Sequence, residues 1–261
     1  MPAEKKLSEL DPSRYTVYQI LESIRDILQI KIVREKTDSL FLFKTEPFID
    51  SLYNFAHILN EDFSEDDLRL INNFFGNHDY RIKALENDNI NKLLLSNGFK
   101  LKNSSYSMIL DNLSELDCSY NLADNVKIMC SDSVNILKDI KAVFVDAFDY
   151  VESDYDRKFG FLDEFRLNSK NNKIKAYVVY ENGEAVSTAS YYAHDRFSIE
   201  NVGTIKSARG KGYAALMLKV LLNEAKKLGY NEACLVSSEV ALSVYKKIGF
   251  KEIIKNNTYT K

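Results

Sequence analysis

The sequence predicts a mixed α/β fold of two domains, with a mostly antiparallel sheet flanked by helices. Three observations lead to this prediction. Helical stretches with an apolar period of 3.6 residues alternate with short strands, three consecutive strands in the second half are separated by tight turns, and a helix-turn-strand pattern occurs in both halves. A chain of 261 residues can form two domains of ordinary size. We expect the domains to span residues 1–120 and 121–261.

Composition excludes several classes of protein. The chain is 45% hydrophobic and 28% charged, as in globular proteins. Its formal charge of -3 and mixed acids and lysines give no basic face, so we expect no nucleic-acid partner. Cys118, Cys130 and Cys234 lack metal-ligand spacing, so neither a disulfide framework nor a metal site is predicted. With no signal peptide and no membrane span, the expected location is the cytoplasm.

Elements of the first half begin with a helix that Asp11 caps and Pro12 opens, because apolar residues recur after it at helical spacing. A strand is expected at 39–44, closed off by Pro47, and helices at 49–59 and 64–75, the second with Ser64 as its cap. A strand at 80–86, a short helix at 90–98 and one or two strands at 99–110 follow. Residues 113–124 are polar and without a period, which indicates a linker.

Elements of the second half begin with a strand at 125–130 and a helix at 134–148, and a further helix ends within 163–170. Strands at 174–180, 184–193 and 197–205 form an antiparallel meander. A helix follows whose apolar stripe runs from Ala214 to Leu228 and which Gly229 closes. A strand at 232–238, a short helix at 239–249 and a last strand at 250–255 complete the order.

Three glycines, Gly203, Gly210 and Gly212, lie just before the helix that carries Ala214. Amides at a helix start lack partners within the helix and lie at the positive end of its dipole, so they can hold a phosphate or diphosphate. Glycines allow the close approach, and Arg209 and Lys211 add positive charge. The loop is therefore interpreted as an anion cradle, with a simple turn as the alternative.

Two other nucleotide motifs fit this loop poorly. A P-loop requires lysine after its last glycine, whereas Lys211 precedes Gly212 and Gly203 is too distant. The stretch "GKGYAA" satisfies the loose dinucleotide pattern, but too few elements follow it, and Glu239 meets the expected acidic position only weakly.

Two motifs carry a resemblance to a known family. Arg209-x-x-Gly212-x-Ala214, entered from the strand "ENVGTI", resembles the coenzyme A motif R/Q-x-x-G-x-G/A of the GNAT (GCN5-related N-acetyltransferase) superfamily. The segment "SSEVALSVYKKIGFKEI" resembles the second signature of that family, N-x-x-A-x-x-x-Y-x-x-x-G-F, in Ala241, Tyr245, Gly249 and Phe250. The resemblance covers roughly residues 124–261, and the order of elements is also that of the GNAT fold.

The resemblance implies a role for each matching residue. The diphosphate of acetyl-CoA would rest on Arg209, Gly210, Lys211, Gly212, Tyr213, Ala214 and Ala215. The pantetheine arm would pair with the backbone of Val202, Gly203 and Thr204, although Gly203 is alternatively a β-bulge. Tyr245 would assist the departing thiolate. Ser238 stands where the family has an asparagine and would bind the cofactor as a weaker hydrogen-bonding group, and Ala233 replaces the glutamate that some members carry.

Glu200 is the nearest alternative base, and a solvated face or a cross-strand pair is the other interpretation of this carboxylate. His194 would either line the acceptor site or stand in an exposed turn.

The first half resembles a degenerate copy of the second. Residues 82–99 align without a gap with residues 233–250, and Asn87 falls opposite Ser238. Leu94 stands opposite Tyr245, and the preceding helix begins with Glu65, Asp66 and Asp67, which would repel a diphosphate. Two unrelated domains are the alternative.

We therefore expect an N-acyltransferase that moves an acetyl group from acetyl-CoA to a primary amine on a small molecule or a protein. The first half would form one side of the acceptor site or would mediate a homodimer. A catalytically silent CoA-binding regulatory or scaffolding module is the main alternative. Aminoacyl transfer from tRNA is disfavoured by the acidic balance and the intact loop.

Overall fold

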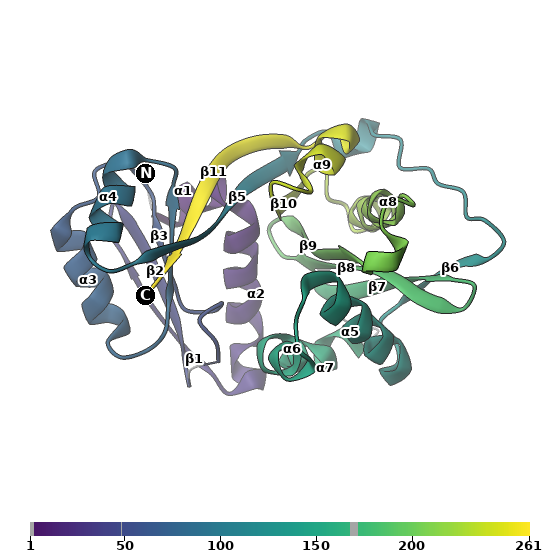
Figure 1. Ribbon diagram of the computed structural model, residues 1–261, viewed down its shortest axis with the longest axis horizontal. Helices are drawn as coiled ribbons and strands as arrows, with labels where there is room; N and C mark the ends of the chain where they lie inside the picture. Colours follow the sequence, from purple (N-terminus) through teal and green to yellow (C-terminus); the bar gives the residue numbers. More distant parts are fainter. Residues whose placement is uncertain (1–2, 48, 168–171) are drawn as a thin grey trace. The chain divides into compact units, whose positions relative to one another are not determined.

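The computed structural model describes residues 3–47, 49–167 and 172–261 (Figure 1). The chain divides into two compact units that exchange segments. Unit 1 comprises Met1–Met108, Val236–Leu242 and Glu252–Lys261, and unit 2 comprises Ile109–Leu235 and Ser243–Lys251. The predicted class, a mixed α/β fold with mostly antiparallel strands flanked by helices, is confirmed.

Unit 1 takes its helices and most of its strands from the first half of the chain. They are α1 (Ala3–Leu10), α2 (Pro12–Leu28), β1 (Lys31–Lys36), β2 (Leu40–Glu46), β3 (Phe55–Ile58), α3 (Glu65–Phe75), β4 (Arg81–Leu85), α4 (Asp88–Ser96) and β5 (Lys100–Leu110). The last strand of the chain, β11 (Lys251–Thr260), pairs antiparallel with β4 and extends the order β1-β2-β3-β4-β11. Only β3 and β4 are parallel among these neighbours.

Unit 2 repeats this pattern. Its elements are η1 (Leu113–Glu115), β6 (Val126–Cys130), α5 (Val134–Phe148), α6 (Glu152–Phe159), η2 (Gly160–Leu162), α7 (Asp163–Leu167), β7 (Ile174–Glu181), β8 (Glu184–Ala193), β9 (Phe197–Thr204), η3 (Lys206–Ala208), α8 (Tyr213–Lys227), β10 (Ala233–Ser237) and α9 (Leu242–Ile248). The strand order is β10-β9-β8-β7-β6, and only the β9–β10 pair is parallel. In both units a helix connects the two parallel strands, because parallel neighbours need a long crossover connection.

One prediction for the first half is wrong, one strand of that half was not predicted, and one prediction for the second half lies partly outside the described residues. The helix expected at 49–59 is instead the strand β3, whose four residues are all buried. A short apolar run that is buried on both faces gives no alternation by which a strand could be recognised. The charged strand β1 was not expected either. Of the helix expected to end within 163–170, α7 accounts for 163–167, and residues 168–170 lie outside the described part of the chain.

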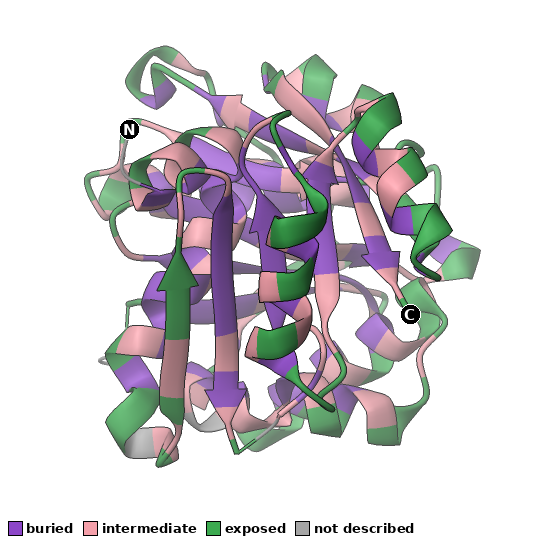
Figure 2. Cartoon of the chain, turned by 90° about the vertical axis from the view of Figure 1, so that its left-hand side faces the viewer, coloured by how far each residue is buried: buried purple, intermediate pink, exposed green. Residues whose placement is uncertain are grey.

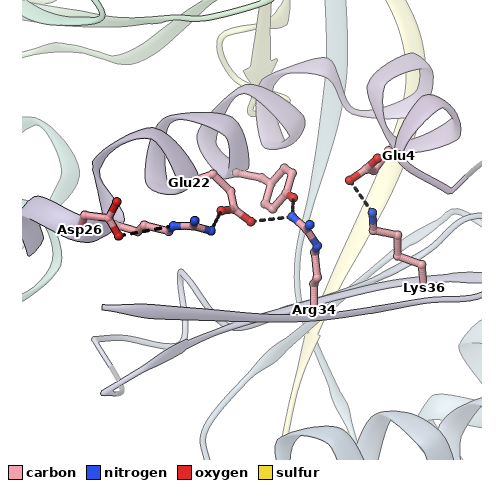
Figure 3. Close-up of polar contacts among 7 residues, drawn as sticks. Glu4, Glu22, Asp26, Arg34 and Lys36 are labelled. Carbon is pink, nitrogen blue, oxygen red and sulfur yellow. Dashed lines mark hydrogen bonds and ion pairs between the residues drawn. The ribbon is translucent and has the colours of Figure 1, made fainter. Parts of the chain in front are cut away.

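The outer strand β1 is tied to α1 and α2 by ion pairs (Figure 3). Arg34 Nη1 lies 2.7 Å from Glu22 Oε1, and Lys36 pairs with Glu4. Charged side chains on an edge strand also discourage pairing with a further chain. The next strands inward are largely buried, as Figure 2 shows for this unit.

Unit 1 also buries three ionisable groups beside the start of α2. Asp11 caps the helix by accepting from the Arg14 amide (3.2 Å) and accepts a hydrogen bond from Lys83. His57 Nδ1 lies 3.9 Å from Asp11 Oδ2, and within the described residues neither ring nitrogen makes a hydrogen bond. Burial lowers the pKa of His57 to about 3, so its ring is neutral at pH 7.

The predicted linker is ordered along α8. Three α8 side chains, spaced by four and three residues, donate to its backbone carbonyls: Lys219 to Ser119 (2.8 Å), Asn223 to Cys118 (3.0 Å) and Lys226 to Leu116 (2.5 Å). This spacing places the three donors on one face of the helix. The segment is therefore part of unit 2. Nowhere in the ranges described above is a helix both long and apolar enough to cross a membrane.

Candidate active site

The glycine loop opens α8 without a side-chain cap. Gly212 is the N-cap residue, with φ 88° and ψ 5°, and no side chain caps the helix there. Gly210 also has a positive φ of 81°, and an added Cβ at either glycine would meet nothing within 4 Å. Both glycines are needed for their left-handed backbone, which other residues adopt only with strain. The space around them is open, so a ligand can approach the first-turn amides of Tyr213, Ala214 and Ala215.

Arg209 fastens the loop to the rest of unit 2. Its Nη2 donates to the Ala147 carbonyl in the last turn of α5 (2.9 Å), and its Nε donates to the Thr204 carbonyl at the end of β9 (3.3 Å). A cation is favourable at a helix C-terminus, where carbonyls lack partners. The guanidinium therefore positions the loop as well as adding charge beside it.

Lys211 is paired with a carboxylate that lies 30 positions earlier in the chain. Its Nζ lies 2.7 Å from Glu181 Oε2, and the Tyr213 hydroxyl also bonds to Glu181. Hydrogen bonds from Lys211 and Tyr213 lower the pKa of Glu181. Glu181 ends β7, and nothing in the local sequence marked it as part of the site.

β9 parts from β10 just before the loop. The two parallel strands pair at Phe197, Ser198 and Ile199, and the last pair is Leu235 with Ile199. β9 continues to Thr204 on the β8 side. The segment from Val202 to Thr204 thus lies beyond the end of the β9–β10 ladder, where backbone groups can pair with an extended ligand.

A β-bulge in β9 marks the point where the two strands part. On the β8 side, Thr188 pairs with Gly203 but Ser190 pairs with Glu200, so β9 contains one extra residue. Asn201 has a φ of 56° at this point and donates from its side chain to Ser190 Oγ (3.2 Å). A bulge of this kind bends the strand and increases its twist.

Gly203 is required by close packing rather than by a bulge. A Cβ there would lie 2.8 Å from Phe148 Cε2 and 2.9 Å from Ala147 Cβ, both on α5. The Gly203 carbonyl accepts from Ser187 Oγ (2.8 Å). The alternative that placed the bulge at Gly203 is wrong, since the extra residue precedes it.

Tyr245 presents a neutral phenol from α9. The side chain is buried, and among the described residues its hydroxyl has no hydrogen-bond partner. Burial, and secondly the charge of Glu200, raise the pKa of Tyr245 to about 12. At neutral pH this hydroxyl is therefore a hydrogen-bond donor with its proton in place.

Glu200 is close enough to Tyr245 for its charge to act on the phenol. Its Oε1 accepts from Ser198 Oγ at 2.6 Å, so one carboxylate oxygen is oriented from the same strand. The charge of Glu200 also acts on Tyr192, a buried residue of β8 that the sequence analysis missed. The structure thus brings Glu200 and Tyr245 together, although they lie 45 positions apart in the sequence.

Two other residues named from the sequence have different surroundings. Ser238 is exposed, belongs to unit 1, and accepts at its carbonyl from Ser237 Oγ (2.7 Å). His194 is half-buried, and its Nδ1 atom lies 3.1 Å from Asp195 Oδ1. The residue borders a cavity of about 330 Å³.

The corresponding region of unit 1 lacks these features. α3 begins with a capping box in which Ser64 Oγ accepts from the Asp67 amide (3.3 Å) and Asp67 Oδ2 accepts from the Ser64 amide (3.0 Å). All four residues of β3 pair with β4, so the strands do not part. Leu94 is buried where unit 2 has Tyr245. Unit 1 therefore has a capped helix start in place of the uncapped one, paired strands in place of the gap, and a leucine in place of the tyrosine hydroxyl.

Comparisons with known proteins agree with this geometry. Residues 137–250 match the family model described as acetyltransferase (GNAT) family. The GCN5-related N-acetyltransferase from Kribbella flavida is similar in structure, with a TM-score of 0.67, 16% identity and 95% of each chain covered.

Two further solved structures share the fold. A second such transferase, from Sphaerobacter thermophilus, has a TM-score of 0.63 at 12% identity over 94% of this chain and 84% of the other. A tandem GNAT protein from the clavulanic acid biosynthesis pathway has a TM-score of 0.55 at 10% identity over 89% and 83%. At these identities the likeness shows the fold alone. No curated protein sequence matches the chain.

Proposed function

Residues 137–250 belong to the acetyltransferase (GNAT) family, and we propose on this premise that the protein transfers an acetyl group from acetyl-CoA to a primary amine. The observation that carries the proposal is the uncapped start of α8 beside the end of the β9–β10 ladder. We further propose that residues 121–261 form the catalytic domain, that residues 1–120 form a degenerate partner domain, and that the protein acts in the cytoplasm.

The diphosphate of acetyl-CoA would lie against Arg209–Ala215. First-turn amides supply donors that need no reorganisation, and the helix dipole favours the negative charge. The open space at Gly210 and Gly212 fits such a ligand, because a side chain at either position would stand where the diphosphate must approach. The pantetheine arm would continue along the backbone of Val202–Thr204, in the manner of an added strand.

In the proposed reaction the amine nitrogen attacks the thioester carbonyl, and a backbone amide of Val202–Thr204 stabilises the oxyanion. Glu200 accepts the proton that the amine loses, directly or through a water. The C–S bond then breaks, and Tyr245 donates a hydrogen bond to the departing thiolate. Full proton transfer from a phenol of pKa about 12 to a thiolate of pKa about 8.5 is uphill by about 5 kcal/mol, so the phenol acts mainly as a donor.

Titration calorimetry with acetyl-CoA on the wild type and on Gly212→Glu tests the central assignment. A carboxylate in the cradle should abolish measurable binding. Gly229→Glu is the matched control, because Gly229 has a similar φ of +85° in open space near the other end of α8 and should leave affinity unchanged. Equal affinity in all three proteins would remove the assignment.

Release of free thiol from acetyl-CoA across a panel of primary amines then tests catalysis. Amine-dependent release supports an N-acetyltransferase. Tight binding with no release for any amine would favour the silent CoA-binding module, an alternative that Ser238 and Ala233 support because they replace polar residues of the family pattern.

A further inference from the structure

The anion cradle contains a carboxylate that competes for its lysine. Lys211, in the middle of the loop, is half-exposed, and its Nζ pairs with Glu181 at 2.7 Å. Glu181 is 21% exposed and is held from a second side by Tyr213, the first residue of α8. Glu181, Lys211 and Tyr213 line a cavity of about 330 Å³ that Asn125 and Leu216 also border. A carboxylate is thus fixed where an anionic ligand would arrive.

Building on the proposed function, we propose that Glu181 is an internal counter-ion that weakens the binding of acetyl-CoA and of the product CoA. In the free protein Glu181 neutralises Lys211. When the diphosphate binds, the Lys211 ammonium leaves Glu181 for the phosphate oxygens. Affinity is reduced by the contact that must break and by the carboxylate that stays nearby.

The exchange has a functional consequence. Acetyl-CoA and CoA carry the same diphosphate, so a competitor for Lys211 weakens substrate and product alike. Weaker binding of related ligands appears mainly as faster dissociation. Glu181 thereby shortens the time for which CoA occupies the site after transfer, and a long occupancy would limit turnover.

Glu181→Gln is the variant that tests this inference most directly. It removes the charge, while its side-chain oxygen can still accept from the Tyr213 hydroxyl, so the start of α8 is preserved. Glu184→Gln is the matched control, because Glu184 lies opposite Glu181 across the β7–β8 turn, is exposed, and forms no ion pair within the described residues. Thermal unfolding of each variant verifies that it folds.

Calorimetry with CoA should show binding roughly three- to tenfold tighter for Glu181→Gln than for the wild type at low salt, and a difference below about twofold in 1 M NaCl, because salt screens exposed charges. Glu184→Gln should match the wild type. In a Lys211→Gln background the increase in CoA affinity caused by Glu181→Gln should be smaller, because no ammonium remains to be exchanged.

Three results would overturn the inference. These are an unchanged affinity in Glu181→Gln, an equal gain in Glu184→Gln, or a gain of the same size in the Lys211→Gln background, which would indicate direct repulsion only. The proposed function fails separately, if the wild type does not bind acetyl-CoA or if Gly212→Glu binds it equally well.

Discussion

Replacing Tyr245 by phenylalanine removes one hydroxyl and leaves the packing intact. The ring lies 6.1 Å from that of Phe250 in an edge contact, which the variant keeps. Because the hydroxyl has no partner among the described residues of the free protein, its loss should shift the melting temperature by less than about 2 °C. The variant therefore reports on catalysis without a confounding loss of fold.

The expected cost follows from the bond that is lost. A hydrogen bond to a charged acceptor is worth about 1.5–3 kcal/mol, which corresponds to a fall in kcat of about 10- to 150-fold. The KM for acetyl-CoA should change little, because the sulfur carries no charge before the thioester breaks. Since the pKa of Tyr245 is about 12, ionisation of the phenol should not reduce the wild-type rate below about pH 11.

Steady-state rates of thiol release between pH 6 and pH 10.5 provide the measurement. Tyr230→Phe is the control, because the Tyr230 hydroxyl donates to the His194 carbonyl, away from the loop, and its loss should leave kcat within twofold. A kcat for Tyr245→Phe within twofold of the wild type would refute the assigned role. So would an alkaline decline near pH 10 that the wild type shows and the variant lacks.

Two further predictions concern stability. Gly203→Ala should destabilise the protein by about 1–3 kcal/mol, because the new Cβ would overlap Phe148; urea unfolding with an unchanged midpoint would contradict the close-packing argument. His57 has a folded pKa of about 3 and an unfolded one of about 6.5. The unfolded state binds more protons between these values. The contribution of His57 to the free energy of unfolding is therefore fully present above about pH 6.5 and falls as pH decreases, by about 3 kcal/mol at pH 4.5. Urea unfolding at pH 7 and pH 4.5 should show a smaller loss for His57→Gln than for the wild type or for the exposed control His78→Gln, and equal losses would show that the buried ring is not responsible.

Local patterns were sufficient for most of the second half. The meander of β7, β8 and β9 and the helix α8 were predicted from alternation, turn residues and an apolar stripe, and the structure confirms them. These signals arise between near neighbours in the chain and survive without tertiary context. The strand β3 was misread because its burial on both faces removes the alternation on which the prediction relied.

The candidate site divides in the same way. The loop from Arg209 to Ala215 is visible in the sequence because glycine spacing and a helix start are local. Glu181 and Tyr192 were not visible, because only folding brings Glu181 into an ion pair with Lys211, 30 positions later, and places Tyr192 where the charge of Glu200 acts on it. The pairing of β11 with β4 could not be foreseen either, since no short-range pattern specifies which edge a last strand will join.

The sequence by itself predicted most helices and strands of the second half, the glycine turn before α8 and the resemblance to the GNAT family, since each depends on spacings within a few turns of chain. Only the tertiary structure decided that β9 separates from β10 beyond Ile199, that α5 packs too closely against residue 203 for a side chain there, and that Lys211 pairs with a carboxylate. Those features are fixed by packing and Coulomb interactions between segments brought together by folding, and such interactions act over distance in space and not along the chain.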